Sequence, residues 1–291
     1  MSEYHTPVML HESISALVTS PDGIYADATF GGGGHTAELL SRLHDGGRVI
    51  AFDRDVDALS NAPDDPRLTL IHNNFRYIEN YREYLGIRDG FDGILADLGV
   101  SSHQFDTAER GFSFRFESDL DMRMNPQASK DAKQVLNSYS CEDLERIFRV
   151  YGEVEHSRKI AELVCKKREL SPIRTTSELG SALESVLPKF SEHKFLAKVY
   201  QALRIEVNDE MAALEKFMPM AVKSLKEGGI LAVITYHSLE DRIVKNAIRD
   251  EIAAGILEKA VRKPVVPTEE EISQNTRARS AKLRVARRKV A

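Results

Sequence analysis

The stretch DATFGGGGHT, residues 27–36, decides the fold of this 291-residue chain. Residues 23–30 have the apolar, β-forming composition of a buried strand, and they run straight into four glycines at 31–34. From residue 36 to residue 43 apolar side chains recur at helical spacing, so a helix follows the glycines at once. A strand that enters a helix through a glycine turn is the first part of a βαβ unit, from which parallel sheets are built.

Four more segments have strand composition and are separated largely by helical patterns. They are residues 48–53, 67–72, 91–98 and 229–236. Between the third and fourth strands the apolar residues at helical spacing are Phe75, Ile78, Tyr81 and Leu85. Strands that alternate with helices pair in parallel, and the helices cover both faces of the sheet. The sequence therefore predicts an α/β fold with a doubly wound, mostly parallel, Rossmann-like sheet.

The regular alternation stops after the fourth strand. Residues 99–130 lack helical periodicity and strand composition, and such a long irregular segment inside a compact domain usually serves function. Residues 131–206 are helical in pattern, with helix starts predicted at Ser140 and at residues 176–178. A further helix over 195–226 is expected to return the chain to the sheet. The predicted boundaries are 1–105 and 207–291 for the sheet domain, and 106–206 for an all-helical insertion.

The composition excludes several classes of protein. With 42% hydrophobic and 29% charged residues the chain is an ordinary globular protein, and its longest apolar stretch, near residues 230–234, is too short to span a bilayer. No segment has the pattern of a signal peptide, so we expect a cytoplasmic protein. Cys141 and Cys165 lack the spacing of a zinc site or a disulfide framework, which favours reduced thiols. The histidines show no ligand spacing, and we expect no metal site.

The end of the chain is locally basic although the net charge is −5. Residues 272–291 contain no acid, and their positive charges are Arg277, Arg279, Lys282, Arg284, Arg287, Arg288 and Lys289. These side chains could contact the phosphates of a nucleic acid. Equally, Lys282 and Arg284 alternate with Leu283 and Val285, which is typical of an edge strand that uses charge to prevent aggregation. The pattern alone leaves both interpretations open.

The glycine turn and Asp53 together predict a nucleotide-like cofactor. Glycines allow the backbone to approach a ligand closely, and a helix N-terminus attracts a carboxylate or phosphate. Asp53 ends the second strand about twenty residues further on, where an acid can bind both ribose hydroxyls. The pairing indicates an adenosyl cofactor. A nicotinamide dinucleotide is disfavoured because Thr36 replaces the third glycine of the GxGxxG pattern, and a turn without a ligand is the remaining alternative.

Asp97 ends the fourth strand in the sequence DLGVSS, residues 97–102. In open α/β sheets the carboxyl ends of the strands carry the substrate and the reactive groups. A carboxylate at this position is therefore a candidate catalytic group. The alternative is a turn acid that is satisfied by local amides.

Nine ordered motifs resemble the bacterial small-subunit ribosomal RNA cytosine-N(4) methyltransferase family, known as RsmH or MraW. They are HTPVM from His5, DATFGGGGHT from Asp27, FDRD from Phe52, DLGVSS from Asp97, RGFSF from Arg110, LDMRM from Leu120, YQALRIEVNDE from Tyr200, TYHSLEDRIVK from Thr235 and NTRARSAKLR from Asn275. The resemblance runs nearly end to end. It implies a class I methyltransferase domain, interrupted by a helical insertion, that uses S-adenosylmethionine to methylate N4 of a cytidine in 16S ribosomal RNA.

The resemblance also implies the residues that contact the cofactor. Carried over by motif, they are Gly33, Gly34, His35, Asp53, Phe75, Asp97 and Gln104. Phe75 could instead be an aromatic of a helix core, and Gln104 could be a solvated loop amide. The partner implied is small-subunit ribosomal RNA, within an assembling ribosomal subunit, and the helical insertion is expected to recognise it. A homodimer is compatible with the sequence.

The chemistry of amine methylation suggests roles for further residues. The exocyclic amine of cytosine is a poor nucleophile, so an acceptor such as Asp97 is expected to take its proton, unless Asp97 serves the cofactor alone. His237 could orient the substrate, although helix capping by Ser238 explains the same segment. The candidates for stacking on the base are Phe105, Phe112, Phe114 and Tyr236, although each could equally be a core aromatic.

Five polar residues of the family motifs, together with Tyr236, are assigned to substrate-side or interdomain contacts. The five are Arg110, Asp121, Arg123, Arg204 and Asn208. Solvated ion pairs of little consequence are the alternative for them. At the level of the whole protein the rival functions are a nicotinamide-dependent dehydrogenase, a noncatalytic RNA-binding or ribosome assembly factor, and a methyltransferase for DNA or protein.

Overall fold

The computed structural model describes residues 7–290, which form two compact units. The sheet unit comprises the described residues up to Ser102 and from Met211 onward, and the helical unit is His103–Glu210. The chain leaves the sheet unit once and returns to it once. Among the described residues, no helix is long and apolar enough to cross a membrane.

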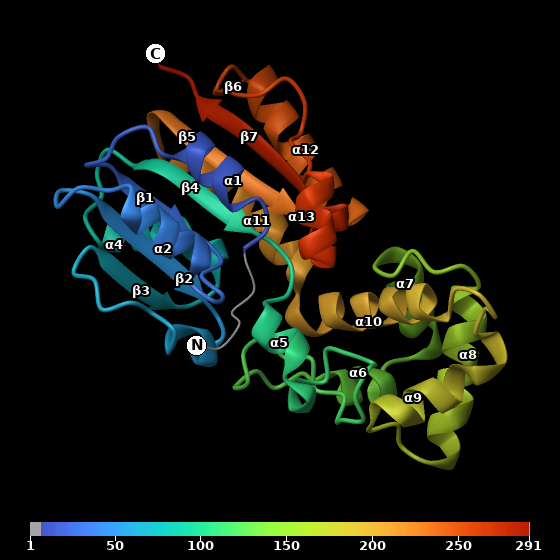
Figure 1. The fold of residues 1–291 in the computed structure, drawn as a ribbon. Helices are drawn as coiled ribbons and strands as arrows, with labels where there is room; N and C mark the ends of the chain where they lie inside the picture. Colours follow the sequence, from blue (N-terminus) through green and yellow to red (C-terminus); the bar gives the residue numbers. More distant parts are fainter. Residues whose placement is uncertain (1–6, 291) are drawn as a thin grey trace. The chain divides into compact units, whose positions relative to one another are not determined.

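The sheet unit is built on seven strands in the order β3-β2-β1-β4-β5-β7-β6 (Figure 1). The strands are β1 Ile24–Asp27, β2 Arg48–Asp53, β3 Leu68–His72, β4 Phe91–Asp97, β5 Leu225–Thr235, β6 Leu257–Lys259 and β7 Lys282–Arg288. Strands β1 to β5 pair in parallel, whereas β7 is antiparallel to both β5 and β6. The predicted doubly wound, mostly parallel sheet is confirmed, and all five predicted strands are present.

Helices cover both faces of this sheet because each face buries its own apolar cluster. On one face α1 Leu10–Leu17 and α2 Gly34–Ser41 contribute Ile14 and Leu39 to a core with Leu95 of β4. On the other face α4 Ile78–Tyr84, α11 Glu210–Ser224 and α12 Ser238–Ala253 pack on Ile94 and its neighbours. The shorter elements are α3 Val56–Leu59, η1 Phe75–Tyr77, α13 Glu269–Gln274 and η4 Thr276–Ser280. The β4 residues thus alternate between the two cores, as the pleat of a strand requires.

The helical unit begins within a short helix, α5 Ser102–Asp106. Its other elements are η2 Ala108–Arg110, α6 Ala132–Ser138, α7 Cys141–Val150, α8 Ser157–Leu170, α9 Thr176–Leu183, η3 Glu184–Val186 and α10 Glu192–Asn208. The predicted helix start at Ser140 is confirmed, because its side chain accepts a hydrogen bond from the Asp143 N–H. The start of α9 is a capping box formed by Thr175 and Glu178.

One expectation, the single helix over 195–226, and one of the two open interpretations of the basic C-terminus are wrong. The single helix predicted over 195–226 is two helices, because Asp209 has a left-handed backbone (φ 52°) that separates α10 from α11, and the residues from Leu225 onward belong to β5. The edge-strand interpretation of the basic C-terminus is also wrong, because β7 lies between β5 and β6. Two of the basic side chains of β7 make contacts within the sheet unit. Arg284 forms an ion pair with Asp241, and Arg288 donates to the carbonyls at the end of α11.

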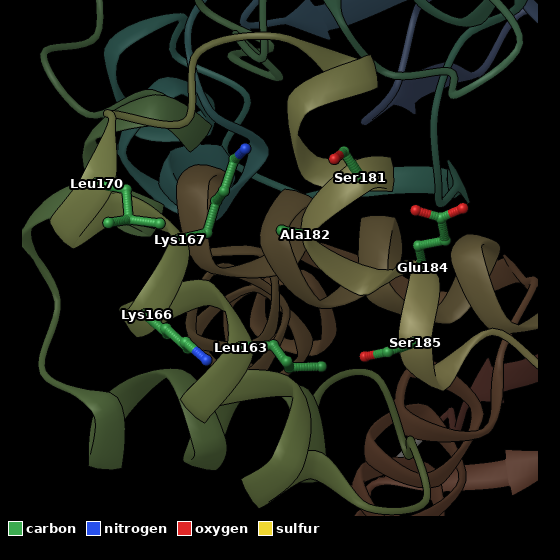
Figure 2. Close-up of a pocket in the computed structure, with 8 residues that line it drawn as sticks. All are labelled: Leu163, Lys166, Lys167, Leu170, Ser181, Ala182, Glu184 and Ser185. Atoms are coloured by element: carbon green, nitrogen blue, oxygen red, sulfur yellow. The ribbon is translucent and has the colours of Figure 1, made fainter.

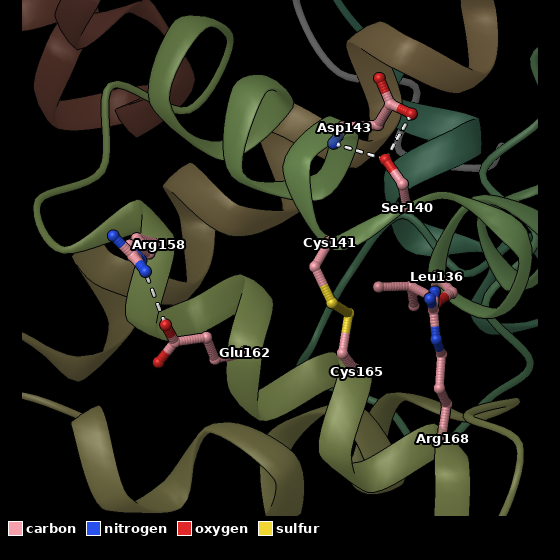
Figure 3. Close-up of a disulfide and its surroundings, with 8 residues drawn as sticks. All are labelled: Leu136, Ser140, Cys141, Asp143, Arg158, Glu162, Cys165 and Arg168. Carbon is pink, nitrogen blue, oxygen red and sulfur yellow. Dashed lines mark hydrogen bonds and ion pairs between the residues drawn. A yellow bond between two sulfur atoms is a disulfide. The ribbon is translucent and has the colours of Figure 1, made fainter.

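The expectation of reduced thiols is also contradicted, since Cys141 and Cys165 form a disulfide (Figure 3). The bond joins the first residue of α7 to the third turn of α8, with the two Cα atoms 6.2 Å apart, within the range that a disulfide spans. The sequence could not reveal this pairing, because only the packing of α7 against α8 brings the two cysteines together. Among the described residues there is no free cysteine.

Candidate active site

The glycine turn between β1 and α2 takes a shape that requires glycine. Gly31 and Gly33 have positive φ angles of 54° and 78°, and a Cβ atom on Gly33 would lie 2.8 Å from the Phe30 ring. A Cβ atom on Gly34 would overlap the ring of Pro7. Helix α2 begins at Gly34 without a side-chain cap, so its first amides are available to an anionic group.

Two carboxylates, the buried Asp27 and the half-buried Asp53, lie at the ends of the neighbouring strands β1 and β2 beside this turn. Asp27, at the end of β1, accepts hydrogen bonds from the Thr29 amide at 3.0 Å and from the Thr36 hydroxyl at 2.7 Å. Asp53, at the end of β2, accepts the Gly31 amide at 2.8 Å and the Asp55 amide, also at 2.8 Å. Burial raises the pKa of Asp53 to about 6, against the opposing effect of these amides. Asp53 is therefore tied to the glycine turn and retains free lone pairs for a further donor.

Asp97 lies at the end of β4 beside the same turn. Its Oδ1 accepts the Tyr236 hydroxyl at 2.6 Å, and its amide donates to the Thr29 hydroxyl at 2.7 Å. Its Oδ2 faces His35 Nδ1 at 3.7 Å, a separation too long for a hydrogen bond. Burial raises the pKa of Asp97 to about 6, while His35 and the Tyr236 hydroxyl act in the opposite direction. One oxygen is thus fixed by the protein and the other is open to a ligand.

Tyr236, predicted as a possible stacking aromatic, serves in the structure as the hydrogen-bond donor to Asp97. Its ring also passes within 3.2 Å of the position that a Cβ atom on Gly99 would occupy. Gly99 has a φ of 112°, so the turn after Asp97 needs glycine both for its backbone and for this close approach. Asp97 and Gly99 of the motif DLGVSS therefore both contact Tyr236 of the motif TYHSLE. Sequence reasoning did not find the Tyr236–Asp97 pair, although both residues end neighbouring strands.

His237 caps helix α12, whereas the sequence analysis offered Ser238 as the cap and substrate orientation as the alternative for His237. Its Nδ1 accepts the Glu240 amide at 3.4 Å, and its Nε2 lies 3.1 Å from Glu240 Oε1. The other oxygen of Glu240 accepts the Tyr236 amide at 2.8 Å. Glu240 is almost fully buried, so this cluster fixes the turn after β5 and with it the position of Tyr236.

Phe75 begins the turn η1 directly after β3 and is partly buried. Its ring packs edge-on against Phe217 of α11, with the ring centroids 4.9 Å apart. The carboxyl ends of β1, β2, β3 and β4 therefore supply Asp27, Asp53, Phe75 and Asp97 to one edge of the sheet unit.

The remaining predicted residues belong to the helical unit. Gln104 is buried there. Arg110 donates to the carbonyls of Arg123 and Met124, and Asn208 brackets the same loop by bonding to the Met124 amide and the Met122 carbonyl. Arg123 pairs with Asp121 through two hydrogen bonds, and Arg204 pairs with Glu210 in the same way. Arg110, Arg123 and Asn208 thus hydrogen-bond to residues of the loop at 121–124. The Arg123–Asp121 pair is half-buried and the Arg204–Glu210 pair is largely buried, so neither is a solvated surface pair.

Of the other stacking candidates, Phe114 lies in an aromatic group of the helical unit. Its ring centroid is 5.7 Å from that of His193 and 5.4 Å from that of Tyr200. Phe112 is buried. Phe105 is partly exposed in α5. The stacking role of each stays a prediction.

A pocket of about 430 Å³ opens in the helical unit between α8 and the segment α9–η3 (Figure 2). Leu163 and Ser185 extend into it from opposite sides, and Lys166, Lys167 and Glu184 stand at its margin. It contains none of the residues expected to bind cofactor or substrate, so we do not associate it with the active site.

The edge of the sheet unit fits an adenosyl cofactor. The uncapped amides of α2 suit a carboxylate, the glycines leave no Cβ atom in the way, and Asp53 and Asp97 offer acceptors to hydroxyl and amino groups. A doubly wound sheet with this edge and a C-terminal antiparallel strand defines the class of the protein: it is an S-adenosylmethionine-dependent methyltransferase.

The comparisons with known proteins identify the family. The chain belongs to the MraW methylase family, whose sequence profile matches residues 2–289. It is 50% identical to the ribosomal RNA small subunit methyltransferase H of Parabacteroides distasonis, over 97% of each chain. It is 49% identical to the protein of that name from Flavobacterium johnsoniae, over 98% of this chain and 97% of the relative. The resemblance in the nine motifs is thereby confirmed.

Proposed function

We propose that this chain transfers a methyl group from S-adenosylmethionine to the exocyclic N4 amine of one cytidine in small-subunit (16S) ribosomal RNA. The observation that carries the proposal is the Asp97 carboxylate beside the glycine turn, with Oδ1 held by Tyr236 and Oδ2 open. Relatives that match the chain at about half of all positions, over nearly their whole length, carry the name of a small-subunit ribosomal RNA methyltransferase.

The cofactor would be held by residues from four strand ends. The amides of Gly34 and His35 at the start of α2 suit the carboxylate of its methionine part, and Asp53 suits the ribose hydroxyls. The Gly33 amide donates to the Phe30 carbonyl, so Gly33 would contribute through its left-handed backbone and its missing Cβ atom. Phe75 offers an aromatic surface to the adenine, and Asp97 is the remaining strand-end residue expected from the motifs. The contact expected for Gln104, which belongs to the helical unit, rests on the motif resemblance alone. When bound, the cofactor supplies an electrophilic methyl group on a sulfonium.

Asp97 would act on the amine that receives the methyl group. The amine gains positive charge as it attacks, and a carboxylate within hydrogen-bond distance stabilises that charge and accepts the proton. Tyr236 fixes the orientation of the carboxylate through Oδ1, so Oδ2 is the atom that would take the proton. We assign His237 a positioning role through Glu240, because both of its ring nitrogens face that residue.

The helical unit is proposed to bind the RNA. It carries a fully exposed aromatic, Phe190, in the loop between η3 and α10, with the exposed Lys189 and Lys194 on either side. Exposed aromatics among cations are typical of surfaces that bind single-stranded nucleic acid. The interactions of Arg110, Arg123 and Asn208 would keep the 121–124 loop of this unit in a fixed shape. Because the proposed substrate is ribosomal RNA, we place the enzyme in the cytoplasm, and a homodimer stays a prediction for sedimentation analysis.

The decisive experiment offers the purified enzyme and labelled methyl donor to small ribosomal subunits that lack the modification. We expect label on one cytidine, located by mass spectrometry of the digested RNA. The Asp97→Asn variant keeps an acceptor for Tyr236 but loses the basic carboxylate, so its turnover should fall by about 10² to 10⁴-fold while it still binds S-adenosylhomocysteine. Label on DNA or protein, or no label at all, would overturn the substrate assignment, and near-normal turnover of Asp97→Asn would remove its catalytic role.

A further inference from the structure

Two of the family motifs, HTPVM and NTRARSAKLR, have no role in the site described so far. The structure brings the described part of the first motif close to the segment that contains the second. Residues Pro7–Met9, here called the strap, lie over the glycine turn, and α13 with the following η4 supports them. Met9 and Val8 share one apolar cluster with Ala278 and Ala281.

The strap touches the turn at two points. The Pro7 ring occupies the space that a Cβ atom on Gly34 would need, so the glycine and the proline fit each other. The Val8 carbonyl accepts a hydrogen bond from His35 Nε2 at 3.2 Å. Because a carbonyl can only accept, this bond places a proton on Nε2 and leaves Nδ1 facing Asp97 Oδ2 at 3.7 Å. The strap therefore determines how the His35 ring is oriented beside Asp97.

A side chain of α13 adds a hydrogen bond to the strap. The Met9 amide donates to Glu271 Oε1 of α13 at 2.6 Å. Met9 is buried and its backbone is left-handed (φ 52°), so without Glu271 its N–H would be a buried donor with no acceptor. The Glu271 amide is in turn capped by the Thr268 hydroxyl, which fixes the base of the helix.

We propose that Glu271 is a positioning residue for the methyl donor: it anchors the strap, and the strap holds Gly34 and His35 in the conformation that binds the donor beside Asp97. This inference rests on the proposed function, because it takes the glycine turn to be the donor site. It also gives the described part of the first motif a role, and Ala278 and Ala281 of the second motif pack in the same apolar cluster as Val8 and Met9.

The test compares three variants of the full-length protein. Glu271→Ala removes the acceptor, Glu271→Met removes it while filling most of the same volume, and Glu271→Gln retains Oε1. We expect loss of the acceptor to weaken S-adenosylhomocysteine binding, measured by calorimetry, by about ten-fold, and Glu271→Gln to stay within about two-fold of the wild type. Glu270→Ala, an exposed neighbour in the same helix, is the matched control and should bind normally.

A second measurement requires neither ligand nor activity. Hydrogen exchange of the Met9 amide in the free protein should accelerate by about ten-fold or more in Glu271→Ala and Glu271→Met, and remain near the wild-type rate in Glu271→Gln. If Glu271→Ala does not fold, Glu271→Met decides. Normal Met9 exchange and normal ligand binding in Glu271→Ala and Glu271→Met would overturn the inference. A loss of ligand affinity in Glu271→Gln as large as in those two variants would also overturn it. Failure of the wild type to bind S-adenosylhomocysteine would instead refute the donor site itself.

Discussion

At the scale of single residues, the protonation of Asp97 controls the proposed chemistry. Burial raises its pKa to about 6, and the Tyr236 hydroxyl opposes that rise because it donates to the charged form. Below about pH 6 the carboxyl group is protonated and cannot accept a proton from the amine. The rate of methyl transfer should therefore increase as the pH rises through about 6 and then level off.

Replacement of Tyr236 by Phe tests this balance. The variant loses the hydrogen bond that favours the charged carboxylate, so the pKa of Asp97 should rise and the acidic limb of the pH–rate profile should move to higher pH. Rates measured between about pH 5 and pH 9 give the limb directly. Tyr84→Phe, which alters an exposed tyrosine of α4, is the control. An unchanged limb in Tyr236→Phe would show that Asp97 does not set the pH dependence.

At the scale of elements, the loop between η3 and α10 is the part of the helical unit best suited to contact RNA. Residues 187–191 follow η3 directly, and Phe190 projects from them into solvent. Lys189 and Lys194 place positive charge on both sides of the ring, and Glu192 is the single acid between them. An aromatic in this setting can stack on an unpaired base while the lysines neutralise phosphates.

Two variants separate stacking from charge in this loop. Phe190→Ala should weaken binding of a single-stranded 16S RNA fragment by about ten-fold, because stacking of one base is lost. Lys189→Gln with Lys194→Gln should lower the slope of log affinity against log salt by about 1 to 2. Fluorescence anisotropy at several salt concentrations measures both. Tyr84→Ala, an exposed aromatic of the sheet unit, should bind normally, and equal binding by Phe190→Ala would exclude the loop.

At the scale of the whole molecule, the chain divides into two units, and the single disulfide lies entirely within the helical one. A cross-link that closes a loop of this kind stabilises mainly by restricting the unfolded chain. The sheet unit contains no cysteine, so its own stability does not depend on the redox state. In a reducing compartment the helical unit alone would lose this contribution.

Reduction should therefore destabilise the helical unit selectively. For a sequence separation of 24 residues we expect a loss of about 3 kcal/mol of unfolding free energy, measured by urea denaturation with and without reductant. The Cys141→Ser, Cys165→Ser protein should not respond to reductant. Equal stability of the oxidised and reduced wild type would show that the bond contributes nothing to the folded state.

The sequence by itself determined the parallel α/β sheet, the glycine turn and the positions of Asp53 and Asp97. These features depend on local patterns: strand composition, helical periodicity, and residues that follow a strand within one turn. The family motifs added the prediction that Phe75 and Gln104 contact the cofactor, a role that no local pattern indicates. The boundary between α10 and α11 was missed because a helical pattern does not reveal the left-handed residue Asp209 that interrupts it.

Which residues interact with one another became evident from the folded structure alone. Tyr236 bonds to Asp97 across 139 positions of sequence, and Glu271 bonds to Met9 across 262. The Cys141–Cys165 bond and the interior place of β7 likewise depend on how elements pack. The physical reason is that a side-chain interaction needs two partners within about 3 Å, and local sequence specifies the conformation near each partner but not the distance between them.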